Sequence, residues 1–350
     1  MDSVTRFGGL SNLPDEQVRY FTENRVYALQ IESTSSCLQE CIYCYAGARP
    51  QTNGILTSTK IIEIIDDAKA LGVKEIDWLG GDPLLRNDWE HLMEHARNQG
   101  LVNNLWTSGT LLADRETCRK VVELTEDGFV SVHLDSINNK TFGLLHRGDA
   151  EKFIKKILNG VENLFGLGKS EDNILNCITY TKLQKPEDVK KTIAWFWKNK
   201  GIRSCVVSFK PAGFGNKMPE LKPSLEDIKN VFEYRDALNY QDSPYKLGSQ
   251  DVNKFYCGTM FCITFDGNVT PCSVIREGIT SVHQKRLREI ISDHLDDLIF
   301  TRMHRPENLP AGCSDCDNNQ VCWGCRANAW YYASDLEAAD PTCWLNVNLK

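Results

Sequence analysis

Apolar, strand-like runs recur along the first two thirds of the chain, and segments with helical spacing or helix signals follow them. The runs occupy residues 25–34, 75–81, 103–109, 129–136, 174–181 and 205–213. Such alternation is typical of βα units around a parallel sheet. Six units between residues 26 and 240 are too few for an eight-stranded barrel. The pattern therefore predicts either an open, doubly wound sheet or a partial barrel.

Two of the intervening helices are well marked. The first is indicated by apolar residues at helical spacing, namely Ile61, Ile64, Ile65, Ala68 and Leu71. The second is predicted to begin at Asn87, because Glu90 three residues later would complete a capping box.

The fourth strand-like run has one polar face. Its apolar residues alternate with Ser131, His133 and Asp135, and Ser208 and Lys210 repeat this pattern in the last run. Buried parallel strands normally have two apolar faces. The polar positions are therefore either a solvated edge or the wall of a site, and the repetition favours a site.

Composition bounds the function classes. The chain has 350 residues, of which 41% are hydrophobic, and its formal net charge is -7. It has no long basic run, no N-terminal apolar segment and no stretch near the ~20 apolar residues of a membrane span. We expect a cytoplasmic protein that binds neither nucleic acid nor membranes.

Fourteen cysteines need an explanation, because disulfides are rare in a reducing compartment. Eleven of them cluster near residue 40 and in the last hundred residues, and metal binding is the leading explanation. Cys118, Cys177 and Cys205 stand apart in apolar patterns, where we expect the thiols to pack as small hydrophobes.

The segment CLQECIYC places Cys37, Cys41 and Cys44 just after the first strand-like run. Three thiolates can hold three irons of a 4Fe-4S cluster and leave the fourth iron open. Zinc is the rival metal, but a structural zinc usually takes a fourth protein ligand. No histidine lies within thirty residues on either side.

This spacing after a first strand resembles the signature of the radical S-adenosylmethionine (radical SAM) superfamily. The resemblance implies that the methionyl group of the cofactor chelates the open iron and that Tyr43 packs near the adenine. LGGDP resembles the family's Gly-Gly-Glu-Pro motif, which would position the methionyl amine. Its matching residues are Gly80, Gly81, Asp82 and Pro83.

Other cofactor contacts implied by the resemblance fall on the later strands. The ribose and carboxylate contacts match Ser108, Ser131, His133, Asp135 and Arg147. His133 is also a candidate proton donor or acceptor to the substrate, with a structural hydrogen-bonding role as the alternative. Lys210 is the second candidate catalytic residue.

The tail resembles the cysteine-rich SPASM extension of the same superfamily. The resemblance implies two fully ligated auxiliary clusters. One would take Cys257, Cys262, Cys272 and Cys325, and the other Cys313, Cys316, Cys322 and Cys343. The chain has two residues between Cys322 and Cys325 where the family pattern has three. Two structural zinc sites are the alternative.

The resemblance implies an α/β fold, a partial (β/α)6 TIM barrel with a C-terminal SPASM domain. We expect an N-terminal segment at 1–25, the radical SAM core at 26–245 and the auxiliary-cluster domain at 246–350. The implied cofactors are S-adenosylmethionine and three 4Fe-4S clusters, with a ferredoxin or flavodoxin as electron donor.

The implied activity is reductive cleavage of the cofactor to a 5'-deoxyadenosyl radical, which abstracts hydrogen from a substrate. A peptide or protein substrate is favoured by the tail, whereas Ser273 after Cys272 argues against sulfatase maturation. A radical oxidoreductase, decarboxylase or epimerase acting on a tetrapyrrole or sugar is the alternative. For a carboxylate-bearing substrate, Lys210, Arg147 and Arg276 are the available cations. A non-catalytic electron carrier is the third hypothesis.

Overall fold

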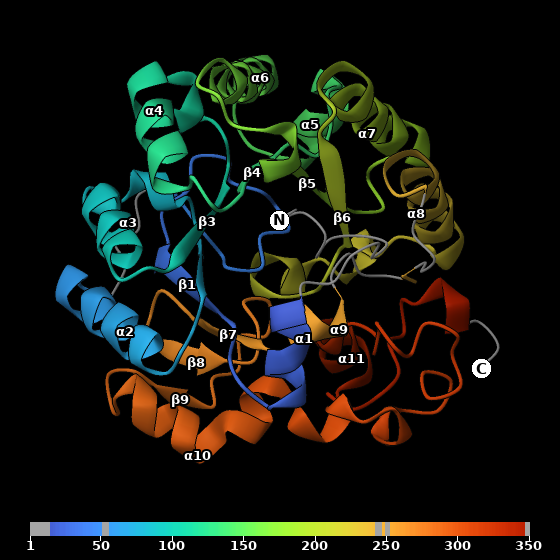
Figure 1. Cartoon of the computed structure of the whole chain (residues 1–350). Helices are drawn as coiled ribbons and strands as arrows, with labels where there is room; N and C mark the ends of the chain where they lie inside the picture. The colour runs from blue at the N-terminus through green and yellow to red at the C-terminus, as the bar shows by residue number, and fades with distance from the viewer. Residues whose placement is uncertain (1–14, 51–55, 242–246, 249–252, 347–350) are drawn as a thin grey trace.

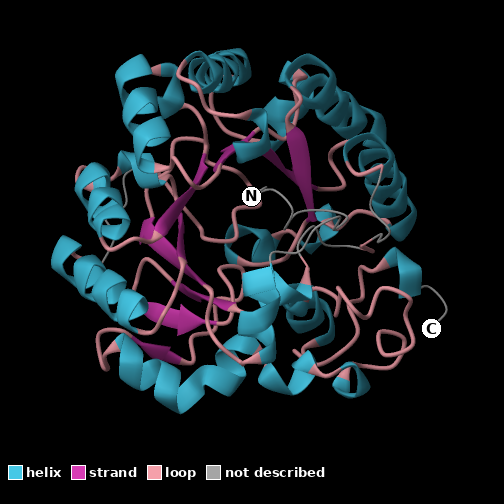
Figure 2. Ribbon diagram, in the orientation of Figure 1, coloured by secondary structure: helices cyan, strands magenta, loops and turns pink. Residues whose placement is uncertain are grey.

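The computed structural model describes residues 15–50, 56–241, 247–248 and 253–346. One sheet with the strand order β6-β5-β4-β3-β2-β1-β7-β8-β9 forms the inner wall, and helices cover its outside (Figures 1 and 2). The first six strands are β1 (Ala28–Thr34), β2 (Glu75–Gly80), β3 (Val102–Thr107), β4 (Val130–His133), β5 (Ile174–Tyr180) and β6 (Arg203–Ser208). They are parallel to one another and match the six predicted strands.

The helices decide between the two predicted sheet types. Those after the first six strands are α2 (Ser58–Ala70), α3 (Trp89–Asn98), α4 (Arg115–Leu124), α5 (Asn139–Leu145), α6 (Ala150–Gly166), α7 (Pro186–Lys200) and α8 (Leu225–Asn239). They form an outer ring around the strands (Figure 1). A doubly wound sheet would have helices on both faces. The fold is therefore a partial barrel, as predicted.

The two faces of the strands differ in chemistry. Outward-facing residues such as Leu29, Ile31 and Val132 pack with α2 residues including Ile61 and Ile64 in one buried core. Ser131 and His133 alternate with this outer set and line the inner wall. The alternation in the fourth run thus separates a helix-covered face from the wall of a lumen.

The C-terminal region continues the barrel sheet. It contributes β7 (Met260–Ile263), β8 (Asn268–Thr270), β9 (Thr280–Ser281), α9 (Lys254–Cys257), α10 (Leu287–Ile299) and α11 (Arg326–Ala333). β7 is parallel to β1, with Ala28 opposite Met260, and β8 and β9 add antiparallel strands. The predicted boundary at 245/246 and most of the predicted N-terminal segment lie outside the described residues, and that segment's described end forms α1 (Asp15–Thr22).

The predicted start of α3 is wrong. The helix begins at Trp89, and the residue before it, Asp88, makes no capping hydrogen bond. The carboxylate of Asp88 instead accepts from Ser58 and forms an ion pair with Arg86 at 2.6 Å. A tertiary contact to α2 has therefore replaced a local cap. Every helix in the described part of the chain is too short or too polar to cross a bilayer.

Candidate functional site

Three thiols converge in the loop between β1 and α2. The loop is closed by backbone hydrogen bonds between Cys37 and Arg49, at 2.8 Å, and between Arg49 and Ser35, at 3.1 Å. The pKa of the Cys37 thiol is raised to about 12, mainly by burial and to a smaller extent by the charges of Asp82 and Cys44. Burial also raises the pKa of Cys41, with Cys44 and Cys37 as the next causes.

The donor set of this loop fits an iron-sulfur cluster. Clustered thiols beside a carboxylate keep their protons unless a cation is present, and bound iron converts them to thiolates. Cys37, Cys41 and Cys44 would hold three irons. When bound, such a cluster supplies a low-potential electron.

The absence of a histidine from the neighbouring sequence does not exclude zinc, because the fold brings two histidines close to Cys41. His133 and His146 each bring a ring nitrogen within 4.8 Å of the other and of the Cys41 sulfur. The fold therefore supplies the histidines that are missing from the neighbouring sequence. The distance of a histidine along the chain therefore does not decide between iron and zinc.

The glycine pair after β2 allows two backbones to approach closely. A Cβ at Gly81 would lie 2.0 Å from the carbonyl oxygen of Ser36, and one at Gly80 would lie 2.2 Å from that of Thr34. The Gly81 amide donates to Thr34 at 2.7 Å, and the Asp82 amide donates to Ser36 at 2.6 Å. These two glycines therefore fix the motif against the start of the cysteine loop.

The carboxylate of Asp82 accepts hydrogen bonds from neutral donors, two at the end of β3 and one in its own loop. Its carboxylate accepts from the hydroxyls of Thr107 at 2.8 Å and Ser108 at 2.5 Å, and from the Leu84 amide at 3.2 Å. Burial raises its pKa, and these hydrogen bonds oppose that rise. Asp82 and Ser108, both predicted cofactor contacts, thus bond to each other. Pro83 follows Asp82 as the first residue of a short 3-10 helix.

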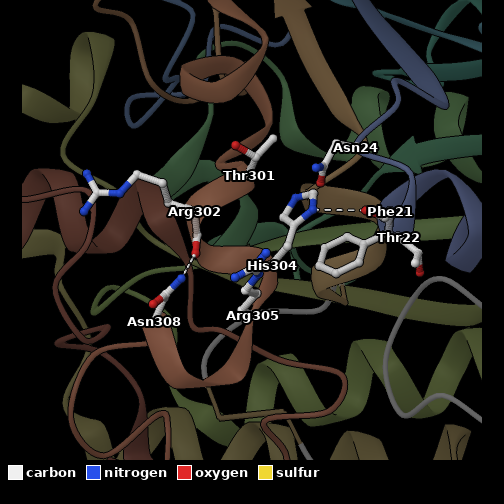
Figure 3. A pocket seen from close by; sticks show the side chains of 8 residues that line it. All are labelled: Phe21, Thr22, Asn24, Thr301, Arg302, His304, Arg305 and Asn308. Carbon is white, nitrogen blue, oxygen red and sulfur yellow. Dashed lines mark hydrogen bonds between the residues drawn. The ribbon is translucent and has the colours of Figure 1, made fainter.

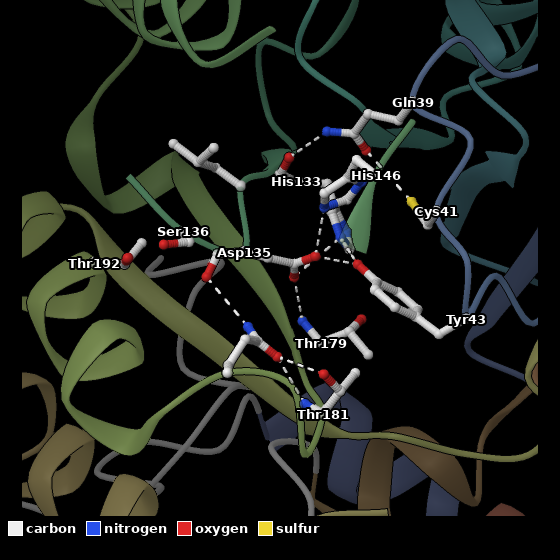
Figure 4. Close-up of polar contacts among 12 residues, drawn as sticks. Gln39, Cys41, Tyr43, His133, Asp135, Ser136, His146, Thr179, Thr181 and Thr192 are labelled. Carbon is white, nitrogen blue, oxygen red and sulfur yellow. Dashed lines mark hydrogen bonds and ion pairs between the residues drawn. The ribbon is translucent and has the colours of Figure 1, made fainter. Parts of the chain in front are cut away.

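Asp135 is the centre of a buried polar network (Figure 4). Its carboxylate accepts from the Tyr43 hydroxyl, from His146 Nε2 at 2.8 Å and from the Thr179 amide at 2.7 Å. His133 Nε2 lies 3.2 Å from the same carboxylate and 2.8 Å from the Tyr43 oxygen. The structure therefore brings together Tyr43, His133 and Asp135, which were predicted separately.

Neighbouring charges explain the pKa shifts of Asp135 and His133 in this network. Burial alone would raise the pKa of Asp135, but His133 and then His146 hold it well below its usual range. Burial likewise opposes protonation of His133, yet the adjacent Asp135 raises the pKa of that histidine well above its ordinary value. A carboxylate and an imidazolium thus stabilise each other beside the cysteine loop.

Three residues of the site were not predicted. His146 is buried next to Arg147, and only its place in LLHRG could have drawn attention to it. Gln39, inside the cysteine motif, donates to the His133 carbonyl at 2.7 Å. Cys177 was predicted to be a core residue, but it is partly exposed.

Cys177 has a distinctive electrostatic environment. Its pKa is lowered to about 6. A hydrogen bond from Cys205 is the largest cause, burial opposes the shift, and the hydrogen bond and charge of His133 contribute to the lowering. The prediction for the other two isolated cysteines was right, since Cys118 and Cys205 are buried among apolar side chains.

The remaining predicted contacts are more scattered. Ser131 is buried in β4, and its hydroxyl has no hydrogen-bond partner among the described residues. Arg147 is exposed. Lys210 is partly buried and donates to the Ser208 carbonyl at 3.0 Å. Arg276 forms an ion pair with the fully buried Glu32, at 2.5 Å.

Several thiols of the C-terminal region lie near one another. Burial raises the pKa of Cys257, and Cys325, Cys272 and Cys322 are the next causes. Cys272 also contributes to the raised pKa of Cys262. The neighbours of Cys257 thus include Cys325 and Cys272 of its own predicted ligand set and Cys322 of the other set. The other set comprises Cys313, Cys316 and Cys322 on the turns before α11 together with Cys343.

A surface hollow of about 580 Å³ lies elsewhere (Figure 3). It is lined by Phe21, Thr22, Asn24, Thr301, Arg302, His304, Arg305 and Asn308. His304 stacks on Phe21 with ring centroids 3.8 Å apart. None of the predicted site residues lines this hollow.

Comparison with known proteins identifies the site. The radical SAM superfamily profile matches residues 31–196, which include the cysteine loop, the glycine pair and the Asp135 network. Residues 31–196 thus form a radical SAM superfamily domain. The chain is a radical SAM enzyme, which rules out the non-catalytic electron carrier.

Relatives of this radical SAM enzyme match most of its length. An AdoMet-dependent heme synthase from Methanosarcina barkeri is 25% identical, with 89% of this chain and 94% of the relative covered. Fe-coproporphyrin III synthase from the same organism is 26% identical, with 97% and 93% covered. Streptococcus suis SuiB, solved with its precursor peptide SuiA, shares the fold at 16% identity and a TM-score of 0.65, with 94% and 79% covered.

Proposed function

We propose that this radical SAM enzyme reductively cleaves S-adenosylmethionine to a 5'-deoxyadenosyl radical and abstracts hydrogen from a peptide or protein segment admitted to the barrel. The convergence of three thiols from one loop beside the glycine pair supports cofactor cleavage. The peptide substrate is supported by the surroundings of the three predicted cations, Lys210, Arg147 and Arg276, and by the peptide that SuiB binds on the same fold.

The surroundings of the three predicted cations favour a peptide substrate over a tetrapyrrole. A tetrapyrrole presents several carboxylates, which require matching cations when they are buried. Arg276 already pairs with Glu32, and Arg147 is exposed. Of these three, Lys210 alone is partly buried and has no acidic partner among the described residues. One ammonium group suits a single carboxylate or a backbone carbonyl better than a set of propionates.

A small-molecule reaction on a tetrapyrrole is the second candidate. It is supported by the names of the two Methanosarcina relatives, whose similarity extends over nearly the whole chain. On this alternative, Lys210 would bind a propionate.

The C-terminal cysteines would hold two auxiliary clusters in this proposal. Cys257, Cys262, Cys272 and Cys325 would form one ligand set, and Cys313, Cys316, Cys322 and Cys343 the other. The electron would come from a ferredoxin or flavodoxin. Three 4Fe-4S clusters correspond to about twelve irons per chain.

Cofactor cleavage is tested by anaerobic reconstitution with iron and sulfide, reduction, and mass spectrometry of 5'-deoxyadenosine. We expect the wild-type protein to form this product. Replacing Cys37, Cys41 and Cys44 together by alanine should abolish it, because three irons lose their ligands. The matched control, Cys118→Ala, alters a thiol of the outer core and should keep the activity. Product formation by the triple variant would contradict the assignment.

The two substrate classes are separated with iron coproporphyrin III as a probe. We expect no change in its absorbance when the reconstituted protein is added. A spectral shift that Lys210→Met weakens at least tenfold would instead favour the tetrapyrrole reaction.

A further inference from the structure

Two cationic side chains are buried in the C-terminal cysteine-rich region. Arg326, the first residue of α11, and Lys254, the first residue of α9, are each only 4% exposed. Arginine and lysine are almost never fully buried unless they are paired. Neither of these two forms an ion pair with an acidic side chain in the part of the chain that the structure describes.

The guanidinium of Arg326 is held by uncharged groups. It donates to the carbonyl oxygens of Leu336 and Ala338, both at 2.8 Å, and to that of Trp323. A guanidinium remains protonated under all conditions in which a protein is folded. A permanent positive charge therefore lies beside Cys325, the residue that precedes Arg326.

The carboxylate of Asp340, on the segment after α11, is engaged by other donors. It accepts from the Cys325 amide at 3.0 Å, from Asn328 at 3.2 Å and from the Thr342 hydroxyl at 2.8 Å, and it forms no ion pair with Arg326. Burial raises the pKa of Cys257, and the charge of Arg326 opposes that rise. The guanidinium thus lies near a second predicted ligand thiol.

Lys254 contacts the same loop from another side. Its amide donates to the Val321 carbonyl and its ammonium to the Asn319 carbonyl, both at 2.8 Å. Burial lowers the pKa of Lys254, and Cys322 opposes this effect. Both buried cations therefore bond to the backbone of residues 319–325, the loop that carries Cys322 and Cys325.

Lys169 shows how a comparable cation is accommodated away from the cysteines. It is 5% exposed, and its ammonium donates to two backbone carbonyls of the turn at 125–128. Burial lowers its pKa to about 8, and Asp127 and Glu126 oppose this effect. Carboxylates thus supply the negative charge near Lys169, whereas thiols take that place near the two C-terminal cations.

We propose that Arg326 and Lys254 supply the countercharge of the auxiliary clusters held by the C-terminal cysteines and thereby raise the reduction potential of these clusters. The inference rests on the proposed auxiliary clusters. A 4Fe-4S core with four thiolates has a net negative charge that grows on reduction, and net charge is one of the factors that set its potential. A fixed cation nearby favours the reduced state, and burial limits the screening of this attraction by salt.

The test isolates the C-terminal clusters in the triple alanine variant of Cys37, Cys41 and Cys44. After anaerobic reconstitution with iron and sulfide, we expect about eight irons per chain. Stepwise reduction with titanium(III) citrate, followed by electron paramagnetic resonance, gives the potentials. In this background, Arg326→Gln and Lys254→Met should each lower the equilibrium constant for one-electron reduction of a cluster at least threefold, which corresponds to about 28 mV.

Charge-keeping variants separate the effect of charge from that of packing. Arg326→Lys and Lys254→Arg should each change the equilibrium constant less than threefold. Lys169→Met removes a buried cation far from the thiols along the chain, and it should also change the constant less than threefold. A smaller change than threefold in a charge-removing variant, or an equal change in its charge-keeping counterpart, would overturn the inference for that residue.

Iron content keeps the test decisive where a variant loses a cluster. Loss of about four irons in the charge-removing variant alone would support the countercharge role. The same loss in the charge-keeping variant would show a role in folding and overturn the inference for that residue. If the triple alanine variant itself binds no iron, the proposed auxiliary clusters fail and the inference falls with them. Iron in that variant with unaltered potentials would overturn the inference alone.

Discussion

The pKa shifts of single residues in the site depend on neighbours from other segments of the chain. Asp82 and Asp135 are both buried carboxylates, yet their pKa values shift in opposite directions. Asp82 is held by hydroxyls and amides, which oppose the effect of burial only in part. Asp135 contacts two histidines, and the charge of His133 together with the hydrogen bonds from both histidines outweighs the effect of burial. The identity of the neighbours therefore decides the direction in which each pKa shifts.

The glycine pair gives a prediction at this scale. Gly81→Ala would place a methyl group 2.0 Å from the Ser36 carbonyl oxygen, so the loops must separate. We expect the free energy of unfolding to fall by about 3 kcal/mol. Gly143→Ala, in α5, is the control, because the nearest described atom to its Cβ outside that helix would be the Cβ of Ala150 in α6, at 3.9 Å. It should be neutral or stabilising by up to about 1 kcal/mol. Urea titration of both variants measures the difference, and equal stabilities would contradict the packing argument.

Sequence reasoning recovered the site where the ligands are close along the chain. Cys37, Cys41 and Cys44 belong to one loop, so their spacing alone indicates a shared ligand. His146, Gln39 and Cys177 could not be found in this way, because they meet His133 or Asp135 only after β4 and β5 have paired. Their chemistry depends on contacts between segments that no local pattern encodes.

Whole elements were predictable to a similar extent. Six strands were located because apolar runs alternate with helices, and α2 buries the predicted residues Ile61, Ile64, Ile65 and Ala68. The start of α3 was not predictable, because Asp88 bonds to Arg86 and to Ser58 of α2. The addition of β7 to the barrel was also unexpected, because a four-residue strand carries too little periodicity to show its partner.

The start of α3 can be tested directly. Asp88→Ala removes the acceptor that joins Arg86 and Ser58, and we expect it to lower the free energy of unfolding by about 1–2 kcal/mol. Asn87→Ala alters the exposed residue that the capping-box pattern would require, and it should change stability by less than about 0.5 kcal/mol. Denaturant unfolding compares the two. A larger loss of stability in Asn87→Ala than in Asp88→Ala would contradict this and support a local cap at Asn87.

At the scale of the molecule, α10 of the C-terminal region is fastened to α2 of the barrel. Asp67 of α2 accepts from Arg286 at 2.9 Å and 2.8 Å and from Arg288 at 2.8 Å. Burial by itself would raise the pKa of Asp67, but hydrogen bonds from Arg286 and the charges of both arginines hold it below its usual value. The two parts of the chain thus share an ion-pair network as well as a sheet.

This network gives a pH dependence. Asp67→Asn should lower the free energy of unfolding at pH 7 by about 1–2 kcal/mol, a modest value because both arginines are half exposed. Because the folded-state pKa of Asp67 is depressed, its contribution is complete above about pH 4 and is lost as the pH falls through the folded-state value. Stability curves of the two proteins should therefore converge in acid. A gap that widens below pH 4 would contradict this.

The pairing of β7 with β1 has a consequence for how the protein can be divided. Four residues of β1, Ala28 to Ile31, form their backbone ladder with β7 on one side and with β2 on the other. A fragment that stops before residue 254 would leave that row of amides and carbonyls bare, and uncovered edges of this kind invite self-association. The C-terminal region thus supplies a strand of the barrel wall, and that wall is intact only when β1 and β7 are present together.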